Sequence, residues 1–241
     1  MGSLSSCIYV VTSVLFPNRE LVTPNELHGA EHVTTRKDES VVVTLHAETL
    51  YLRSGSVPIA LSDVWPESAT LLDKTKFSPE SVLERGGLVN MRFSLWPDAG
   101  RMRIVLPAQL LGIWARWSSD VYIDVLRSED ENTAEDLPDR CEIVLDMAER
   151  RIGADVEIPG GNRSVISEPD AILRQEQFES AIDGLVSTSA HHAKAPLSSS
   201  PDRRYLVISF GPGRLGSGIV LTGAIVSRLA QLSTDVLLKV A

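Results

Sequence analysis

Two segments of this sequence align with each other without a gap, and this internal similarity constrains the fold more than any other feature. Residues 93–126 match residues 208–241 identically at ten of 34 positions. Unrelated sequences of ordinary composition would share about two residues over this length. Several of the other pairs keep side-chain character, as in the replacement of Leu110 by Ile225. We therefore predict that the chain is a tandem duplication of one structural unit.

The aligned segments predict the same order of elements in both copies. In the first copy, residues 91–96 and 102–106 are β-forming and flank a turn sequence at 97–100, which predicts an antiparallel hairpin. Pro107 suits the first turn of a helix, and the apolar residues after it recur at helical spacing. Residues 121–126 carry β-branched and aromatic side chains and predict a strand. Each copy is therefore expected to end β-β-α-β.

The remaining segments predict an α+β protein in which each copy is a mostly antiparallel sheet covered on one face by helices. Residues 7–16 predict a buried strand, and residues 40–61 predict two or three strands with a turn at 46–48. Residues 75–86 predict a short helix and residues 168–186 an amphipathic one. Two such units can pair by their open faces or edges, which leaves a groove between the copies.

An acidic segment divides the two copies. Residues 127–140 are poor in apolar side chains and contain a proline, which is typical of a linker. The predicted organisation is a first copy at 1–128, a linker at 129–139 and a second copy at 140–241. The polar stretch 187–204 has the composition of a loop, functional or merely flexible.

Composition excludes some classes of function. The net charge of −9 argues against a protein that binds nucleic acid or anionic membrane through surplus lysine and arginine. The acidic surface fits a basic protein partner or serves solubility. The apolar run at 7–16 is too short to span a bilayer, so we expect no transmembrane segment and a cytoplasmic location. Residues 1–6 match a myristoylation pattern, so a lipid anchor at Gly2 is the alternative.

Residues 211–216 fit the G-x-G-x-x-G pattern of a dinucleotide-binding loop. The internal alignment instead places a second strand at 219–221, so the glycines would lie between two strands and not between a strand and a helix. The following strand carries Lys239 where a ribose-binding acid is expected. We therefore predict no nucleotide cofactor.

A metal site is the sharpest enzymatic hypothesis. His28, Glu31 and His32 fit the pattern H-x-x-E-H, in which two histidines one helical turn apart bind zinc and the glutamate activates water. Gly29 weakens the required helix, and residues 99–119 lack the acidic third ligand that this arrangement needs. No other catalytic pattern stands out, so an enzyme is the less favoured class.

Asp120 and Asp235 occupy the same place in the two copies, after Ser-Ser and Ser-Thr respectively. They predict either a paired-carboxylate site or, as the favoured interpretation, short polar side chains that bond free backbone groups where a helix ends and a strand begins.

The function that these observations favour is a non-enzymatic protein-binding or adaptor protein, acidic and inhibitor- or immunity-like, on a pseudo-twofold scaffold. Ten of the 13 aromatic residues precede residue 127, so the first copy is the expected place for an apolar partner, with Trp65 and Trp96 as protein-binding candidates. A homo-oligomer stays open. The alternative is a small-molecule-binding protein or a metal-dependent hydrolase that uses the cleft between the copies.

Overall fold

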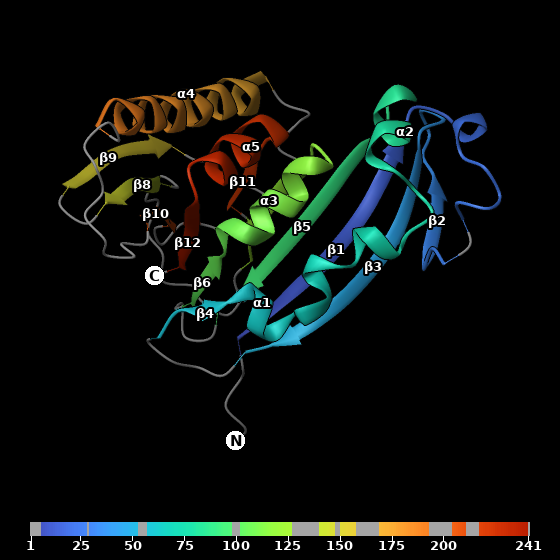
Figure 1. Cartoon of the computed structure of the whole chain (residues 1–241), viewed down its shortest axis with the longest axis horizontal. Helices are drawn as coiled ribbons and strands as arrows, with labels where there is room; N and C mark the ends of the chain where they lie inside the picture. Colours follow the sequence, from blue (N-terminus) through green and yellow to red (C-terminus); the bar gives the residue numbers. More distant parts are fainter. Residues whose placement is uncertain are drawn as a thin grey trace.

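The chain folds as an α+β protein with two six-stranded mixed sheets and a layer of helices (Figure 1). The computed structural model describes most of the chain, in nine stretches: residues 6–27, 29–52, 57–97, 102–126, 140–147, 150–157, 169–192, 204–210 and 217–240. The predicted linker and Gly2 lie outside these residues.

Sheet A is built mainly from the first half of the chain, with β1 in its interior. β1 pairs antiparallel with β3 and β5, and β5 pairs parallel with β7. The strands in spatial order are β11 (Ser217–Leu221), β7 (Asp120–Val125), β5 (Leu88–Trp96), β1 (Cys7–Phe16), β3 (Val41–Tyr51) and β2 (His32–Thr35).

Sheet B is built mainly from the second half. Its central pair is parallel, and most of its other pairs are antiparallel. The strands in spatial order are β4 (Ile59–Ala60), β6 (Met102–Leu106), β12 (Thr234–Val240), β10 (Arg204–Phe210), β8 (Arg140–Met147) and β9 (Arg150–Glu157).

The helices gather on one side of each sheet (Figure 1). Among the helices of the described residues, none is both long and apolar enough to cross a membrane. They are α1 (Leu61–Val64), α2 (Pro79–Glu84), α3 (Ala108–Arg116), α4 (Pro169–His192) and α5 (Gly223–Gln231), with short 3-10 turns at η1 (Arg19–Leu21), η2 (Pro66–Ala69) and η3 (Leu72–Lys74). Ser78 begins α2 by accepting a hydrogen bond from the Ser81 N–H, as expected of an N-cap.

The predicted hairpin between β5 and β6 is wrong. β5 lies in sheet A, whereas β6 crosses into sheet B and pairs with β12. In the same way β11 leaves β10 and pairs with β7 in sheet A. A β-forming sequence specifies an extended strand, but long-range packing selects its partner. The first half of the chain thus contributes two strands, β4 and β6, to sheet B, and the second half contributes β11 to sheet A.

The two halves nevertheless repeat the same geometry at an interval of 115 residues. β6 and β11, like α3 and α5, have equivalent bounds, and both segments end β-β-α-β. The pairing of Leu221 with Val121 corresponds to that of Leu106 with Val236. The serine that follows each helix has a left-handed backbone conformation, with a φ of 48° at Ser118 and 51° at Ser233. Common descent of the halves by duplication remains a prediction.

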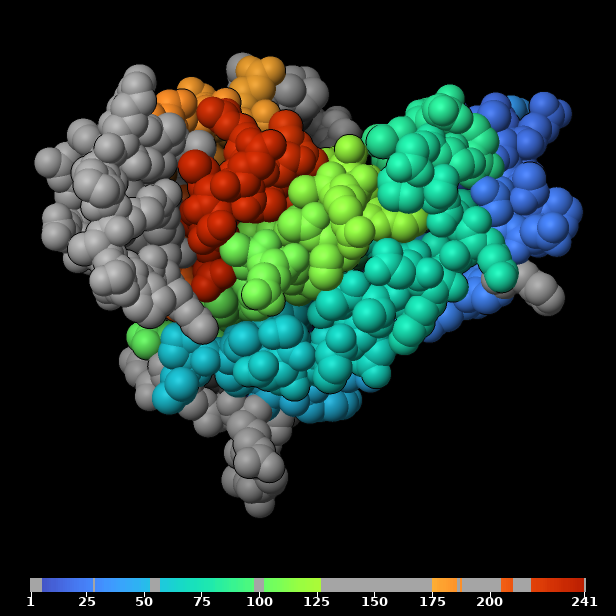
Figure 2. Space-filling model, in the orientation of Figure 1, coloured from blue at the N-terminus to red at the C-terminus, as the bar shows by residue number. Residues whose placement is uncertain are grey.

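One hydrophobic cluster joins both halves, and α3 and α5 pack side by side within it (Figure 2). The predicted apolar stripe of α3 is part of this core, since Leu110, Leu111 and Trp114 are buried. The indole of Trp114 packs against Phe93 of β5, with ring centroids 5.7 Å apart. Core packing is therefore the role of this stripe.

Two further expectations need correction. The turn predicted at 46–48 is absent, because β3 continues through these residues and absorbs an irregularity opposite Thr12 and Ser13 as a β-bulge. The predicted loop at 187–204 is wrong at its start, because α4 continues to His192. Polar composition alone does not distinguish a helical turn from a loop.

Candidate functional site

The metal hypothesis stays a prediction. His28 lies outside the described residues. Glu31 precedes β2 and His32 begins it, so these two side chains do not share a helix. Gly29 has a φ of +98°, which a helix cannot contain. Among the described residues, no group of three or more histidine, cysteine, aspartate or glutamate side chains is placed to hold a metal ion.

Glu31 instead approaches His46 of β3. The Nδ1 atom of His46 lies 3.4 Å from a carboxylate oxygen of Glu31, and Nε2 lies 3.3 Å from one of Glu48. The Nε2 contact is electrostatic, since its geometry makes no hydrogen bond. The imidazole also stacks on Trp65, with centroids 5.5 Å apart and planes 11° apart. Because the carboxylates flank opposite sides of the ring, they fix its orientation and do not converge on one point.

The two tryptophans proposed for protein binding lie in different environments. Trp65 is 1% exposed and packs against His46 and Phe93, so its indole is part of the core. Trp96 is partly exposed and pairs with Cys7 at the end of β5. Of the two, only Trp96 presents surface to a partner in this structure.

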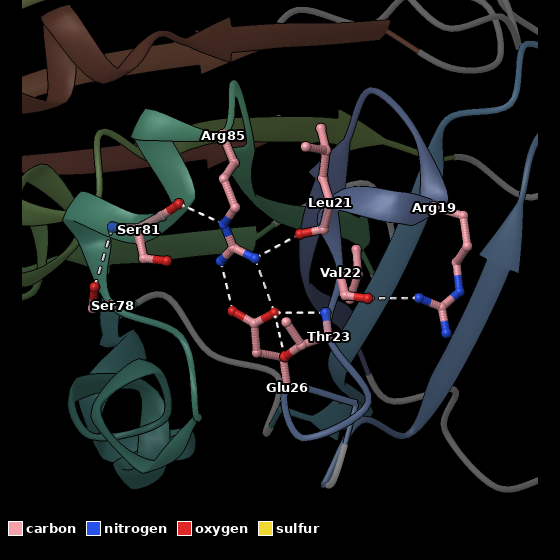
Figure 3. A network of polar contacts seen from close by, with 8 residues as sticks. All are labelled: Arg19, Leu21, Val22, Thr23, Glu26, Ser78, Ser81 and Arg85. Carbon is pink, nitrogen blue, oxygen red and sulfur yellow. Dashed lines mark hydrogen bonds and ion pairs between the residues drawn. The ribbon is translucent and has the colours of Figure 1, made fainter.

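The most extensive polar network in the described residues ties a loop to α2 (Figure 3). Arg85 donates two hydrogen bonds to the Glu26 carboxylate and others to the carbonyls of Leu21 and Ser81. Glu26 also accepts from the N–H and hydroxyl of Thr23. Burial favours a higher pKa for Glu26, but the bonds from Arg85 and Thr23 and the charge of Arg85 outweigh it and lower the pKa. With its donors engaged, this pair is a structural clamp.

The repeated aspartates bind backbone, as predicted, but across the halves. The Oδ1 of Asp120 accepts from the N–H of Gly223 at the start of α5, at 2.8 Å. The Oδ1 of Asp235 accepts from the N–H of Ala108 at the start of α3, also at 2.8 Å. Both carboxylates therefore cap a helix N-terminus of the opposite half and face its positive end.

The glycine-rich segment 211–216 lies outside the described residues. The elements around it do not form a strand–loop–helix unit, because β10 ends at Phe210 and a second strand, β11, precedes α5. The helix N-terminus that would face a phosphate in a dinucleotide-binding fold is instead capped by Asp120.

One face of sheet A points away from the helices. Alternate residues of its strands face the helices and belong to the core, whereas the apolar residues between them belong to no part of the core cluster. Figure 1 shows α1, α2 and α3 in front of the sheet, on the opposite side. We call this surface the outer face. At its β2 edge His32 and Thr34 lie opposite Thr44 and Val42. In the four central strands of the sheet it comprises Cys7, Tyr9, Val11, Ser13, Leu15, Val42, Thr44, Ala47, Thr49, Tyr51, Leu88, Asn90, Arg92, Ser94, Trp96, Asp120, Tyr122 and Asp124.

The outer face is apolar and aromatic. Ten of the 18 residues in its four central strands are apolar or aromatic, and five more are neutral polar residues. Tyr51 is 75% exposed, Leu88 46% and Tyr9 37%. Cys7 of β1 pairs with Tyr51 of β3 and with Trp96 of β5, and Tyr9 lies two residues further along β1, so three adjacent strands place aromatic side chains at one end of the face.

The three charged side chains of its four central strands are engaged, and the charge of Arg36, next to β2, also acts on Tyr122. The Nε of Arg92 lies 2.7 Å from the Oδ2 of Asp124, and Asp120 caps α5. Burial, together with the charge of Asp120, raises the pKa of Tyr122, whose phenol stays neutral. The helix side differs sharply, because residues 61–86 expose seven charged side chains there: Asp63, Glu67, Asp73, Lys74, Lys76, Glu80 and Glu84.

The sequence does not predict this face, because the nearly continuous apolar run of β1 is typical of a strand that is buried on both sides. Tyr9, Val11 and Leu15 continue the apolar pattern of the core residues between them. The available signal was the concentration of aromatic residues in the first half of the chain.

Comparison of the chain with protein-family models, with curated proteins and with solved structures finds no match.

Proposed function

We propose that this chain is a non-enzymatic protein-binding protein and that the outer face of sheet A is its interface. The observation that carries the proposal is a partly exposed sheet face that is rich in aromatic and apolar residues and whose four central strands carry no unpaired charge. Tyrosine and tryptophan are enriched, and charged residues depleted, in the cores of protein interfaces. Exposed aromatic and aliphatic side chains that lie together on one face of a folded protein are typical of an interaction site.

The arrangement of the titratable groups supports a binding role more than a catalytic one. The most ordered acid–base pair, Glu26 and Arg85, is saturated by backbone and side-chain bonds. His46 is held between two carboxylates and an indole. Asp120 and Asp235 are occupied as helix caps. These groups therefore stabilise the scaffold that carries the outer face.

Site-specific photo-crosslinking tests the proposal. A photoreactive phenylalanine analogue at Tyr51, in the cell that produces the protein, is expected to crosslink to protein. The matched control carries the analogue at Glu84, which is exposed on α2, and is expected to give no specific product. Equal products at the two positions, or none at Tyr51, would refute the proposed interface.

A further inference from the structure

We infer that the partner of the outer face is a second copy of this chain, packed face to face against the first. The inference rests on the proposed function, because it names the occupant of the same surface. Three features of the described residues carry it: the neutrality of the face, the placement of its one ion pair, and the geometry of an uncovered sheet.

Neutrality argues against a basic partner. The chain carries a net charge of −9, so a basic protein would be attracted to free carboxylates. The outer face offers none, because Asp124 is paired with Arg92 and Asp120 is bonded to a backbone N–H. Two copies of an acidic chain repel each other over most of their surfaces, and a neutral face is where they meet at the lowest electrostatic cost.

The ion pair makes the face complementary to itself. Arg92 is 51% exposed at its side chain and Asp124 is 20% exposed, so a cation and an anion lie side by side on neighbouring strands. A twofold axis that passes close to this pair brings Arg92 of each copy towards Asp124 of the other. Each copy therefore supplies both members of a charge-matched contact, as an isologous interface requires.

The geometry of the sheet suits the same arrangement. Two sheets with the natural twist pack face to face about 10 Å apart, with their apolar side chains interdigitated. Tyr9, Tyr51 and Trp96 would fill the space at one end of the interface, and Leu15, Val42 and Leu88 the other end. Such an interface is largely aromatic and aliphatic, which is the composition of stable homodimers.

Sedimentation velocity of the purified full-length chain tests the inference. We expect a monomer–dimer equilibrium between about 1 µM and about 1 mM, the range of weak to moderate affinities. Because net repulsion opposes dimerisation, raising NaCl from about 0.05 M to about 0.5 M is expected to strengthen the dimer. A monomer at all concentrations overturns the inference, as does a dimer that salt dissociates.

Variants locate the interface. Tyr9→Glu is expected to weaken the dimer by more than about 100-fold, because it would bury an unpaired carboxylate. Tyr51→Glu, at a position that is 75% exposed in the monomer, gives the same test without risk to folding. The matched control is Leu83→Glu on α2, which is 45% exposed and lies on the opposite side. A dimer that all three variants leave intact uses another surface, and the inference is then wrong.

The crosslinking experiment separates this inference from the proposed function. A product from Tyr51 with twice the 26.3 kDa mass of one chain supports both. A product with a different protein alone overturns the second copy as occupant and leaves the protein-binding role standing. Failure to crosslink to any protein refutes both.

Discussion

The reciprocal helix caps at the junction between the halves lead to a quantitative prediction. Replacing Asp235 with alanine removes the oxygen that accepts the Ala108 N–H at 2.8 Å. Loss of an N-terminal cap lowers the free energy of unfolding by roughly 1 kcal/mol. In a protein of this size that change lowers the melting temperature by about 2–4 °C. We expect Asp235→Ala to show this loss, and Asp235→Asn a smaller one because only the interaction with the helix dipole is removed.

Asp120 should behave differently because its environment disfavours the charge. Burial, together with the negative charge of Glu179, raises the pKa of Asp120 above 3.8, although the Gly223 N–H acts in the opposite direction. The folded state therefore binds the proton more tightly than the unfolded chain. Ionisation of this group lowers stability as the pH rises from 3.8 through the raised pKa.

Asp120→Asn keeps an oxygen acceptor and removes the charge. We expect this variant to be at least as stable as the wild type at pH 7 and to lose its relative advantage below pH 3.8. Asp120→Ala loses the acceptor and should be less stable than Asp120→Asn by roughly 1 kcal/mol. Urea unfolding followed by circular dichroism, at both pH values, measures the four differences. If Asp120→Asn destabilised the protein as much as Asp120→Ala, the reasoning about burial and charge would be refuted.

Three further predictions concern the scaffold. Glu26→Gln should destabilise the protein by roughly 1–3 kcal/mol at pH 7, because it leaves the charge of Arg85 without its counterion. The pKa of Glu26 is lowered in the folded state, so the wild type should lose this stabilisation as the pH falls below 4.5 through that lowered pKa. Urea titrations of Glu26→Gln should lack this loss. Gly223→Ala should destabilise the protein, because its Cβ would lie 2.6 Å from the Ser118 carbonyl oxygen. Gly112→Ala on α3, where nothing lies within 4 Å of the added Cβ, should instead stabilise the protein by roughly 0.5–1 kcal/mol. Thermal melts of the two variants check this prediction, and equal shifts in melting temperature would contradict it. Trp114→Leu introduces the residue that the second half carries at position 229. It should lower the free energy of unfolding by roughly 2–4 kcal/mol, because Trp114 is fully buried against Phe93. An unchanged urea midpoint would contradict this and show that the core refills the space.

The candidate site was predictable only in part. The sequence pointed to the first half of the chain through its aromatic residues, and Trp96 does lie on the outer face. It also pointed to Trp65, which the structure buries beneath His46 and Phe93. An aromatic side chain has the same local signature in a core and on an exposed sheet face. Only the position of the helices decides which of the two it occupies.

The sequence by itself determined the elements and their order. Apolar periodicity and turn residues act over a few positions, so β1, α2, α3, β7 and the β-β-α-β order of both segments follow from local chemistry. Tertiary structure alone decided which strands pair, because β6 and β11 pair with β12 and β7 through residues that lie 92 to 138 positions apart in the sequence, such as Leu106 and Val236. It also decided which face of sheet A is covered. Strand alternation defines two faces, but the packing of distant helices selects the one that becomes the core.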